Sequence, residues 1–236
     1  MKALNYLLAI TAICCLLTSC QSAIDGEGKI NLHNAKIENF ENIYLEIPAH
    51  VILEESDSIT CTIACQDNIF NEINVHSESK KLIIESNKKF KVQRPVEIRI
   101  TVPTVNYIDI AGNGTIEYNP TKYLKKLKVE LKGKSKVIST VNAGEVNIAV
   151  IDNGDAILAG KVENLEGMIN GSGDIHAYDL VAEKCKLEIN GSGNVRCSPS
   201  ALLKAYINGS GNIYYKGTPE IKSEITGSGQ IKRESK

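Results

Sequence analysis

The feature that most constrains the fold is a seven-residue motif that recurs through the second half of the chain. The segment 169–175 is INGSGDI, and close copies begin at Ile189, Ile207 and Ile225. Three more divergent copies precede it. A repeat with spacings of 18 to 21 residues predicts a stack of similar units. Aligned on the first glycine of GSG, the anchor residues are Gly112, Gly133, Asp152, Gly171, Gly191, Gly209 and Gly227.

Apolar columns flank this anchor. The positions six before, two before and four after it are apolar or small, as Leu165, Ile169 and Ile175 are in one copy. These offsets share one parity, so all three side chains point to the same side of an extended chain, which a helix does not allow. We therefore expect an all-β fold, a single-stranded, right-handed parallel β-helix (β-solenoid). Its coils would stack about 4.8 Å apart around one core.

The glycines themselves predict a tight corner. The anchor and the residue two positions later have the inward parity, where a larger side chain would clash inside the bend and glycine allows unusual φ and ψ. The Ser between them, and the Asn or Asp that follows, point outward and can cap turn amides. This interpretation is favoured over a phosphate-binding loop. The calcium-binding nonapeptide repeat does not match either, because glycines cluster only once per coil.

The first half of the mature chain lacks these corners but keeps alternating apolar runs, for example over residues 43–47 and 96–102. Polar turn clusters separate the runs. We expect a less regular N-terminal β region over residues 30–105, regular coils over 106–232, and a short tail over 233–236. One continuous architecture is preferred to a separate β-layer docked onto the solenoid.

The N-terminus resembles a bacterial lipoprotein signal peptide over residues 1–19. Lys2 precedes an apolar stretch too short to span a bilayer, and LTSC at 17–20 resembles a lipobox. The similarity implies cleavage before Cys20 and lipidation of Cys20, followed by a lipidated linker over 20–29. An ordinary signal peptide with a chance cysteine is the alternative. We expect an exported protein anchored by lipid to the cell envelope, at the outer membrane and facing the periplasm or the exterior.

Net charge and cysteine positions further limit which partners and cross-links the protein can have. Removing Lys2 from the 27 basic residues leaves 26 against 28 acidic ones, a net charge of about −2 that, with export, argues against nucleic acid. Cys61 and Cys65 would lie roughly 13 Å apart in a strand, too far for a disulfide. They and Cys185, which occupies an aliphatic column, are expected in the core. The exposure of Cys197, and a Cys185–Cys197 disulfide, stay open.

Acidic residues raise the questions of calcium and catalysis. Asp155 and Asp174 occupy the same column in adjacent coils, with Asp152 close by. Stacked like charges make a calcium site conceivable, and two solvated turn residues are the alternative. A β-helix-type polysaccharide lyase or hydrolase would need such clustered acids. The histidines lack metal-ligand spacing, and the GSG serines lack the strand–turn–helix setting of a nucleophile. We expect no catalytic residue and no cofactor other than calcium.

Two sets of outward side chains are candidates for binding. A basic stripe of outward parity could meet an anionic glycan or lipid headgroups, although a solvated face is the alternative. Tyrosines near the C-terminal coils could stack on sugars or could cover the end of the core. The candidates are Lys126, Lys128, Lys132, Lys134, Lys136, Tyr206, Tyr214 and Tyr215.

The order of motifs resembles one family. FENI from Phe40 leads to VIL from Val51, and EIRITVP from Glu97 leads to residues 108–116 and the repeated NGSG(D/N)I. This combination is similar to the head GIN-domain family, autotransporter-type adhesins that are common as lipoproteins of Bacteroidetes, over about residues 30–232. The resemblance implies a β-helical exported domain and brings no catalytic residues. We expect a surface adhesin or binding scaffold whose partner is a glycan or a protein.

Overall fold

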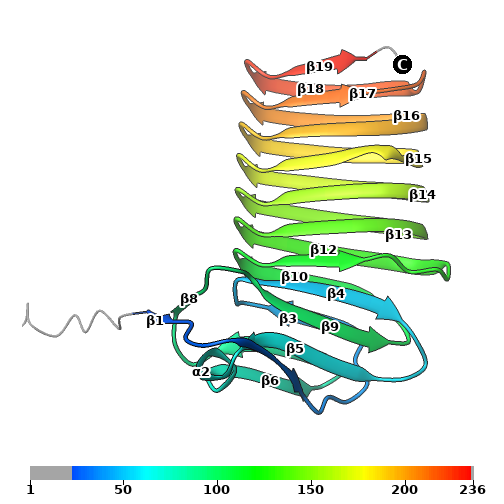
Figure 1. The fold of residues 1–236 in the computed structure, drawn as a ribbon. Coiled ribbons are helices and arrows are strands. Elements are labelled where there is room, and N and C mark those ends of the chain that lie inside the picture. Colours follow the sequence, from blue (N-terminus) through cyan, green and yellow to red (C-terminus); the bar gives the residue numbers. More distant parts are fainter. Residues whose placement is uncertain (1–22, 235–236) are drawn as a thin grey trace, which may run out of the picture.

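The computed structural model describes residues 23–234, which form a tall stack of β-strands (Figure 1). One short helix, α2 (Asp67–Phe70), interrupts the strands, and no helix in this part of the chain could cross a membrane. The strands of the N-terminal region are β1 (Ile24–Asp25), β2 (Ile30–Asn34), β3 (Asn42–Leu45), β4 (Ala49–Glu55), β5 (Thr60–Gln66), β6 (Ile73–Glu78), β7 (Lys81–Ser86), β8 (Phe90–Lys91) and β9 (Val96–Val102).

The repeats form a solenoid of two layers, as predicted. In each coil the chain runs along the first layer, turns at the glycine corner and continues along the second layer. Neighbouring coils pair in parallel with the anchors in register, so that Gly133 lies opposite Asp152 and Gly171 opposite Gly191. The strands are β10 (Tyr107–Gly112), β11 (Thr115–Tyr118), β12 (Leu124–Gly133), β13 (Lys136–Asp152), β14 (Asp155–Gly171), β15 (Asp174–Gly191), β16 (Asn194–Gly209), β17 (Asn212–Tyr215), β18 (Glu220–Gly227) and β19 (Gln230–Arg233).

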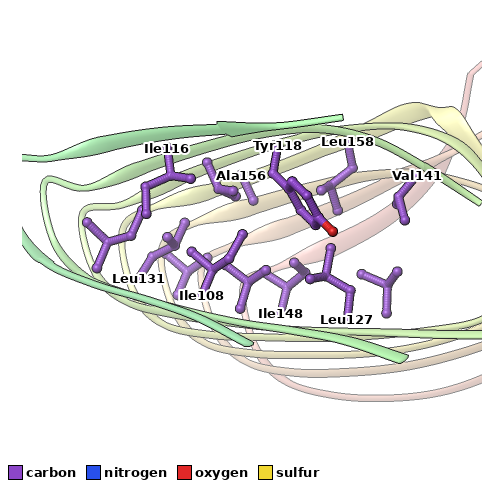
Figure 2. Close-up of a cluster of buried hydrophobic side chains, with 14 of the residues drawn as sticks. Ile108, Ile116, Tyr118, Leu127, Leu131, Val141, Ile148, Ala156 and Leu158 are labelled. Atoms are coloured by element: carbon purple, nitrogen blue, oxygen red, sulfur yellow. The ribbon is translucent and has the colours of Figure 1, made fainter. Parts of the chain in front are cut away.

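The three predicted apolar columns form the core between the layers. Figure 2 shows Ile116 and Leu158 of the second layer facing Leu131 and Ile148 of the first. Burying these side chains on both sides is what holds successive coils together, at about 25 cal/mol per Å² of apolar surface removed from water. In the last coil the columns lose this cover, and Ile225 is 42% exposed.

The corner glycines are required for the two predicted reasons and for a third, contact between coils, that the sequence did not reveal. A Cβ on Gly193 would lie 2.1 Å from the carbonyl oxygen of Gly173, and one on Gly211 would lie 2.2 Å from that of Gly193. The shortest contact is therefore with the backbone of the preceding coil, and a second contact is with an inward side chain, such as Ile189 Cγ2 at 2.7 Å from a Cβ on Gly211. The anchors also need positive φ, from 73° at Asp152 to 139° at Gly171, where most side chains are strained.

The N-terminal region is continuous with the solenoid. Strands β3 and β4 form a coil that pairs in parallel with β10 and β11, placing Ile43 opposite Ile108 and Val51 opposite Ile116. On its other side this coil pairs in parallel with β7 and β9. The coil that comes first in the sequence is thus enclosed between two later ones. One buried cluster runs from Phe40 to Ile213, so the N-terminal coils and the glycine-cornered coils share one core.

Antiparallel strands close the N-terminal end of the stack. Strand β5 pairs with β9, β6 pairs with β7, and β2 pairs with β5, all antiparallel. Residues 1–19 and Cys20 lie outside the described residues. The expected linker ends inside the fold, because Ile24 and Asp25 pair with Phe90 and Lys91.

All four cysteines among the described residues are buried free thiols. This confirms the core positions predicted for Cys61, Cys65 and Cys185 and places Cys197 in the core as well. Burial raises the pKa of Cys61 to about 12 and that of Cys65 to about 11, the latter with help from the charge of Asp67. These thiols are therefore protonated packing groups at neutral pH.

Candidate functional site

The outward side of the first layer is hollowed along the solenoid axis. Two adjoining hollows, of about 240 and 410 Å³, share Lys186 and Glu188 and together extend from β12 to β18. We refer to them jointly as the groove. Six strands at about 4.8 Å spacing give the groove a length of about 24 Å. Its outward-facing lining comes chiefly from the columns five, three and one before the anchor, namely Lys128, Asn147, Ala149, Glu166, Met168, Lys186, Glu188, Asn190, Tyr206, Asn208, Glu224 and Thr226.

Side-chain size explains the first hollow. Ala149 lies in the same column as Glu130 and Met168, and its short side chain leaves a depression between them. The polar wall of this hollow is an ion pair between adjacent coils, in which Lys186 Nζ lies 3.6 Å from Glu166 Oε1. The hollow therefore combines an apolar floor with a charged rim.

The second hollow contains an aromatic ring and a short ladder of amides. Tyr206 is 40% exposed and stands in register between Glu188 and Glu224. Asn190 Nδ2 donates to Glu188 Oε1 at 2.8 Å and to Asn170 Oδ1 at 3.1 Å. An exposed ring beside amide and carboxylate groups can stack on an apolar sugar face while hydrogen bonding to its hydroxyls.

The predicted basic stripe is not one surface. Lys126, Lys128 and Lys132 lie on β12 and are each paired with an acid. Lys134 lies at the exposed corner between β12 and β13, and Lys136 lies beyond it in the second layer. The glycine corner at residue 133 separates them, which outward parity alone did not reveal.

The ion pairs at β12 neutralise much of this positive charge. Lys132 Nζ lies 2.8 Å from Asp109 Oδ1, and this hydrogen bond is the main reason that the lysine pKa is raised. Lys128 Nζ lies 2.7 Å from Glu130 Oε1 and 4.7 Å from the Tyr107 ring centroid. Hydrogen bonding to Lys128 lowers the pKa of Glu130. These lysines therefore hold coils together more than they present free charge.

The three predicted tyrosines are also dispersed. Tyr206 lines the groove, whereas Tyr214 points outward from the second layer, beneath the guanidinium of Arg196 at 5.4 Å. Tyr215 points inward and packs against the core, which matches the alternative that it covers the end of the core. Only Tyr206 thus belongs to the groove.

The acidic column lies in the second layer, away from the groove. Asp155 and Asp174 are in register, as predicted, and Asp152 occupies the preceding corner. Asp174 Oδ1 accepts hydrogen bonds from the backbone N–H of Asn194 at 2.7 Å and from its side-chain amide at 3.1 Å. Residues 23–234 contain no group of three or more His, Cys, Asp or Glu side chains placed to hold a metal ion. The calcium site stays a prediction.

The same column shows what the residue after GSG does. Asn194 Oδ1 accepts from the amide of Asn212, and Asn212 Oδ1 accepts from the backbone N–H of Gln230. With the bonds from Asn194 to Asp174, these form a ladder in which each side chain caps the next coil. The predicted turn capping thus operates between coils, through side-chain and backbone donors.

Most groove residues were missed by the sequence interpretation. Asn190 belongs to the repeated NGSG motif but Lys186 and Glu188 to no motif, and these residues become neighbours of Tyr206 and Glu224 only through stacking of coils. A signal was available, because the anchor alignment also defines the outward columns five, three and one before the corner. Reading those columns as surfaces would have placed Tyr206 between two carboxylates.

Comparisons with known proteins agree with this fold. A putative adhesin from Bacteroides fragilis is 26% identical over 90% of this chain and all of its own, with a TM-score of 0.83. A putative lipid binding protein from Parabacteroides distasonis is 24% identical over 91% of this chain and all of its own (TM-score 0.75). A putative adhesin from Parabacteroides merdae is 20% identical over 90% of this chain and 99% of its own (TM-score 0.74).

No curated protein matches the chain significantly. A family model does match, over residues 39–219, which covers both the N-terminal coils and the glycine-cornered ones. The family's description is "Putative auto-transporter adhesin, head GIN domain", in agreement with the resemblance found in the sequence. The β-solenoid, its corners and this match together show that the chain belongs to the head GIN-domain family.

Proposed function

We propose that this protein is an exported, non-catalytic adhesin or binding scaffold of the bacterial cell surface, and that its groove binds an extended glycan. The observation that carries the proposal is the groove itself, which joins an exposed aromatic ring, an amide ladder and several charged groups over six strands. Its length of about 24 Å suits a polymer of several sugar units better than a compact metabolite.

Family membership supports the adhesive role. The family is described as adhesins, and the similar structure from Bacteroides fragilis is described as a putative adhesin. A repetitive surface also suits a repetitive ligand, because outward positions of the same geometry recur at each coil. A protein partner in extended conformation is the second candidate, since the same amides and carboxylates can bind a peptide backbone.

Two carboxylates beside the groove are poorly suited to act as general acids. A glycoside hydrolase needs a carboxylic acid whose pKa is raised, so that it can donate a proton. The pKa values of Glu130 and Glu145 are instead lowered by hydrogen bonds from Lys128 and Lys126. A β-helix-type carbohydrate-active enzyme remains the competing function and is tested together with binding.

A glycan array with residues 23–234 tests the groove. We expect Tyr206→Ala to weaken binding by about tenfold, because stacking of an aromatic ring contributes about 0.5–1.5 kcal/mol and the ring also sets the orientation of the sugar. Tyr214→Ala is the matched control, since this tyrosine also points outward but from the other layer. Equal losses of binding in the two variants would refute the groove proposal. So would the absence of binding by the parent protein.

Product analysis on any glycan that binds distinguishes an adhesin from an enzyme. We expect intact glycan after prolonged incubation. Release of shorter products by the wild-type protein would support an enzyme instead. Release that persists in the Tyr206→Ala variant would place the active site outside the groove.

We further propose that Cys20 carries the lipid anchor. Labelling of cells with an alkyne fatty acid should mark the wild-type protein, and Cys20→Ser should abolish the label and release the protein from membranes. Protease shaving of intact cells then distinguishes surface display from a periplasmic location. Loss of the protein from shaved cells is the result expected for an adhesin.

A further inference from the structure

The C-terminal end of the solenoid is an open ledge. Strand β18 pairs with β16 along one edge, and among residues 23–234 no strand pairs with its other edge. Strand β19 pairs with β17 in the same one-sided way. Every residue of β18 is exposed. An open edge of this kind leaves backbone N–H and C=O groups available to another strand.

The ledge is apolar where the core would continue. Ile221 and Ile225 belong to the inward columns, and they are 40% and 42% exposed. Their counterparts one coil earlier, Leu203 and Ile207, are 0% and 2% exposed. This difference in exposure is the apolar surface that one further coil would cover.

We propose that the occupant of this ledge is a second copy of the same chain, paired tail to tail. The two β18 strands run antiparallel about a two-fold axis that passes between the two copies of Ser223. Ile221 of each copy then lies opposite Ile225 of the other, on the core side. Lys222 of each copy lies opposite Glu224 of the other, on the outer side.

The charge pattern of β18 selects this register. Directly opposite residues in an antiparallel pair point to the same side of the sheet, so the two-fold axis must pass between the two copies of a single residue. An axis at Lys222 places two lysines face to face and Glu220 opposite Glu224. An axis at Glu224 places two glutamates face to face. The axis at Ser223 gives two opposite-charge pairs and two isoleucine pairs, whereas an axis at Ile221 gives two opposite-charge pairs (Glu220 with Lys222) but only one isoleucine pair and leaves Ile225 uncovered.

The other end of the molecule also has an unpaired edge, on β2, which among residues 23–234 pairs only with β5 and exposes Ile30 (45%) and Leu32 (76%). Elsewhere this end is closed by antiparallel strands, and the segment before β3 lies against β6, where the N–H of Glu38 donates to Ser77 Oγ at 3.3 Å. A head-to-tail filament would have to pair β18 with β2, whose sequence INLHN contains no Asp, Glu, Lys or Arg to complement Lys222 and Glu224. A closed two-fold dimer is therefore the assembly that the exposed charges and apolar groups fit.

The dimer would extend the proposed binding groove. A two-fold axis perpendicular to the first layer keeps the outward faces of both copies on the same side. Because Glu224 and Thr226 line the C-terminal end of the groove, the two grooves would meet at the interface. The dimer itself does not depend on the proposed function, since it is measured without any ligand.

Charge exchange tests the register. Analytical ultracentrifugation of residues 23–234 over a concentration series should show a reversible monomer–dimer equilibrium. Lys222→Glu alone and Glu224→Lys alone should each weaken dimerisation by about tenfold or more, since like charges then lie opposite. An equimolar mixture of the two variants should form a heterodimer. Both glutamates of the Lys222→Glu variant then lie opposite lysines of the Glu224→Lys variant. Lys204→Glu, in the same column one coil earlier, is the matched control and should leave the dimer intact.

A cross-link tests the axis directly. Directly opposite residues have Cα atoms about 4.5–5.5 Å apart, within the range of a disulfide, so Ser223→Cys should give a covalent dimer on mild oxidation. Glu220→Cys should not, because its own copy is six residues away along the partner strand. A monomer at all concentrations, filaments, or single charge variants that dimerise like wild type would overturn the proposal.

Discussion

Gly193 should be among the positions least tolerant of a methyl group. Its Cβ would lie 2.1 Å from the carbonyl oxygen of Gly173 and 2.9 Å from Ile169 Cγ2. Because close C···O contacts lie at about 3.3 Å, Gly193→Ala must move the two coils apart locally by about 1.2 Å. Its φ lies outside the range that strains other residues, so the cost comes from the contact alone.

The size of the effect follows from what that movement breaks. The backbone N–H groups of Ser192 and Gly193 donate to the carbonyl of Gly171 at 2.9 and 3.2 Å. Losing two such bonds costs about 2 kcal/mol, and overpacking adds about 1–3 kcal/mol. We expect Gly193→Ala to lower the free energy of unfolding by about 3–5 kcal/mol. Urea unfolding followed by circular dichroism measures it.

Gly167→Ala is the matched control. Its Cβ would meet Leu187 Cδ2 at 2.9 Å and Ile175 Cδ1 at 3.1 Å, which are the ends of side chains that can rotate away. We expect a cost of about 1 kcal/mol or less, partly offset because alanine reduces the entropy of the unfolded chain. If Gly193→Ala cost no more than Gly167→Ala, the backbone contact between coils would not be what requires glycine.

The remaining predictions concern the core, acid stability, the thiols and calcium. Ile189→Asp should unfold several coils together, because it buries an unpaired charge at a position that is 0% exposed; loss of circular dichroism confined to one coil, or a cost typical of a surface change, would contradict the shared core. Glu55, held at a pKa of about 2 by hydrogen bonds from Thr121 and Lys122, stabilises the fold above the ordinary carboxyl pKa, and that contribution is lost as pH falls from about 4.5 towards 2. Glu55→Gln should lower the free energy of unfolding by about 1–3 kcal/mol at pH 7 and make stability less dependent on pH in acid. An unchanged pH profile would show that these hydrogen bonds to Glu55 do not stabilise the fold. The four cysteines should not react with a thiol reagent in the native protein and should react in urea, and rapid native labelling would show that they are not buried. The melting temperature in calcium should equal that in chelator if Asp174 serves only as a cap, whereas a rise in calcium would support the predicted site.

The repeat itself was enough to predict the coils. A parity that places Ile169, Ile175 and Leu165 on one side of an extended chain is a local property, because side chains alternate along any strand. The burial of Cys185 followed from its column in the same way. The register between coils was also predictable, since the anchor aligns each coil with the next.

The first half was not predictable at this level, and of the groove only the outward columns were. Pairing of β3 with both β7 and β10 joins segments about 39 and 65 residues apart, and no local pattern specifies which edge a later strand will choose. Likewise, Tyr206 meets Glu188 and Glu224 only because three coils stack in register. The alternation of residues also assigned the basic stripe to one side but could not show that a corner divides it.

The sequence alone therefore determined the coil, its inward face and its corners, because these depend on alternation and on residue size at fixed spacing. The tertiary structure decided which outward side chains share a surface, why the second glycine must be glycine, and where the stack is left open. Those properties depend on contacts between coils, which arise only when segments distant in the sequence are brought to within one strand spacing.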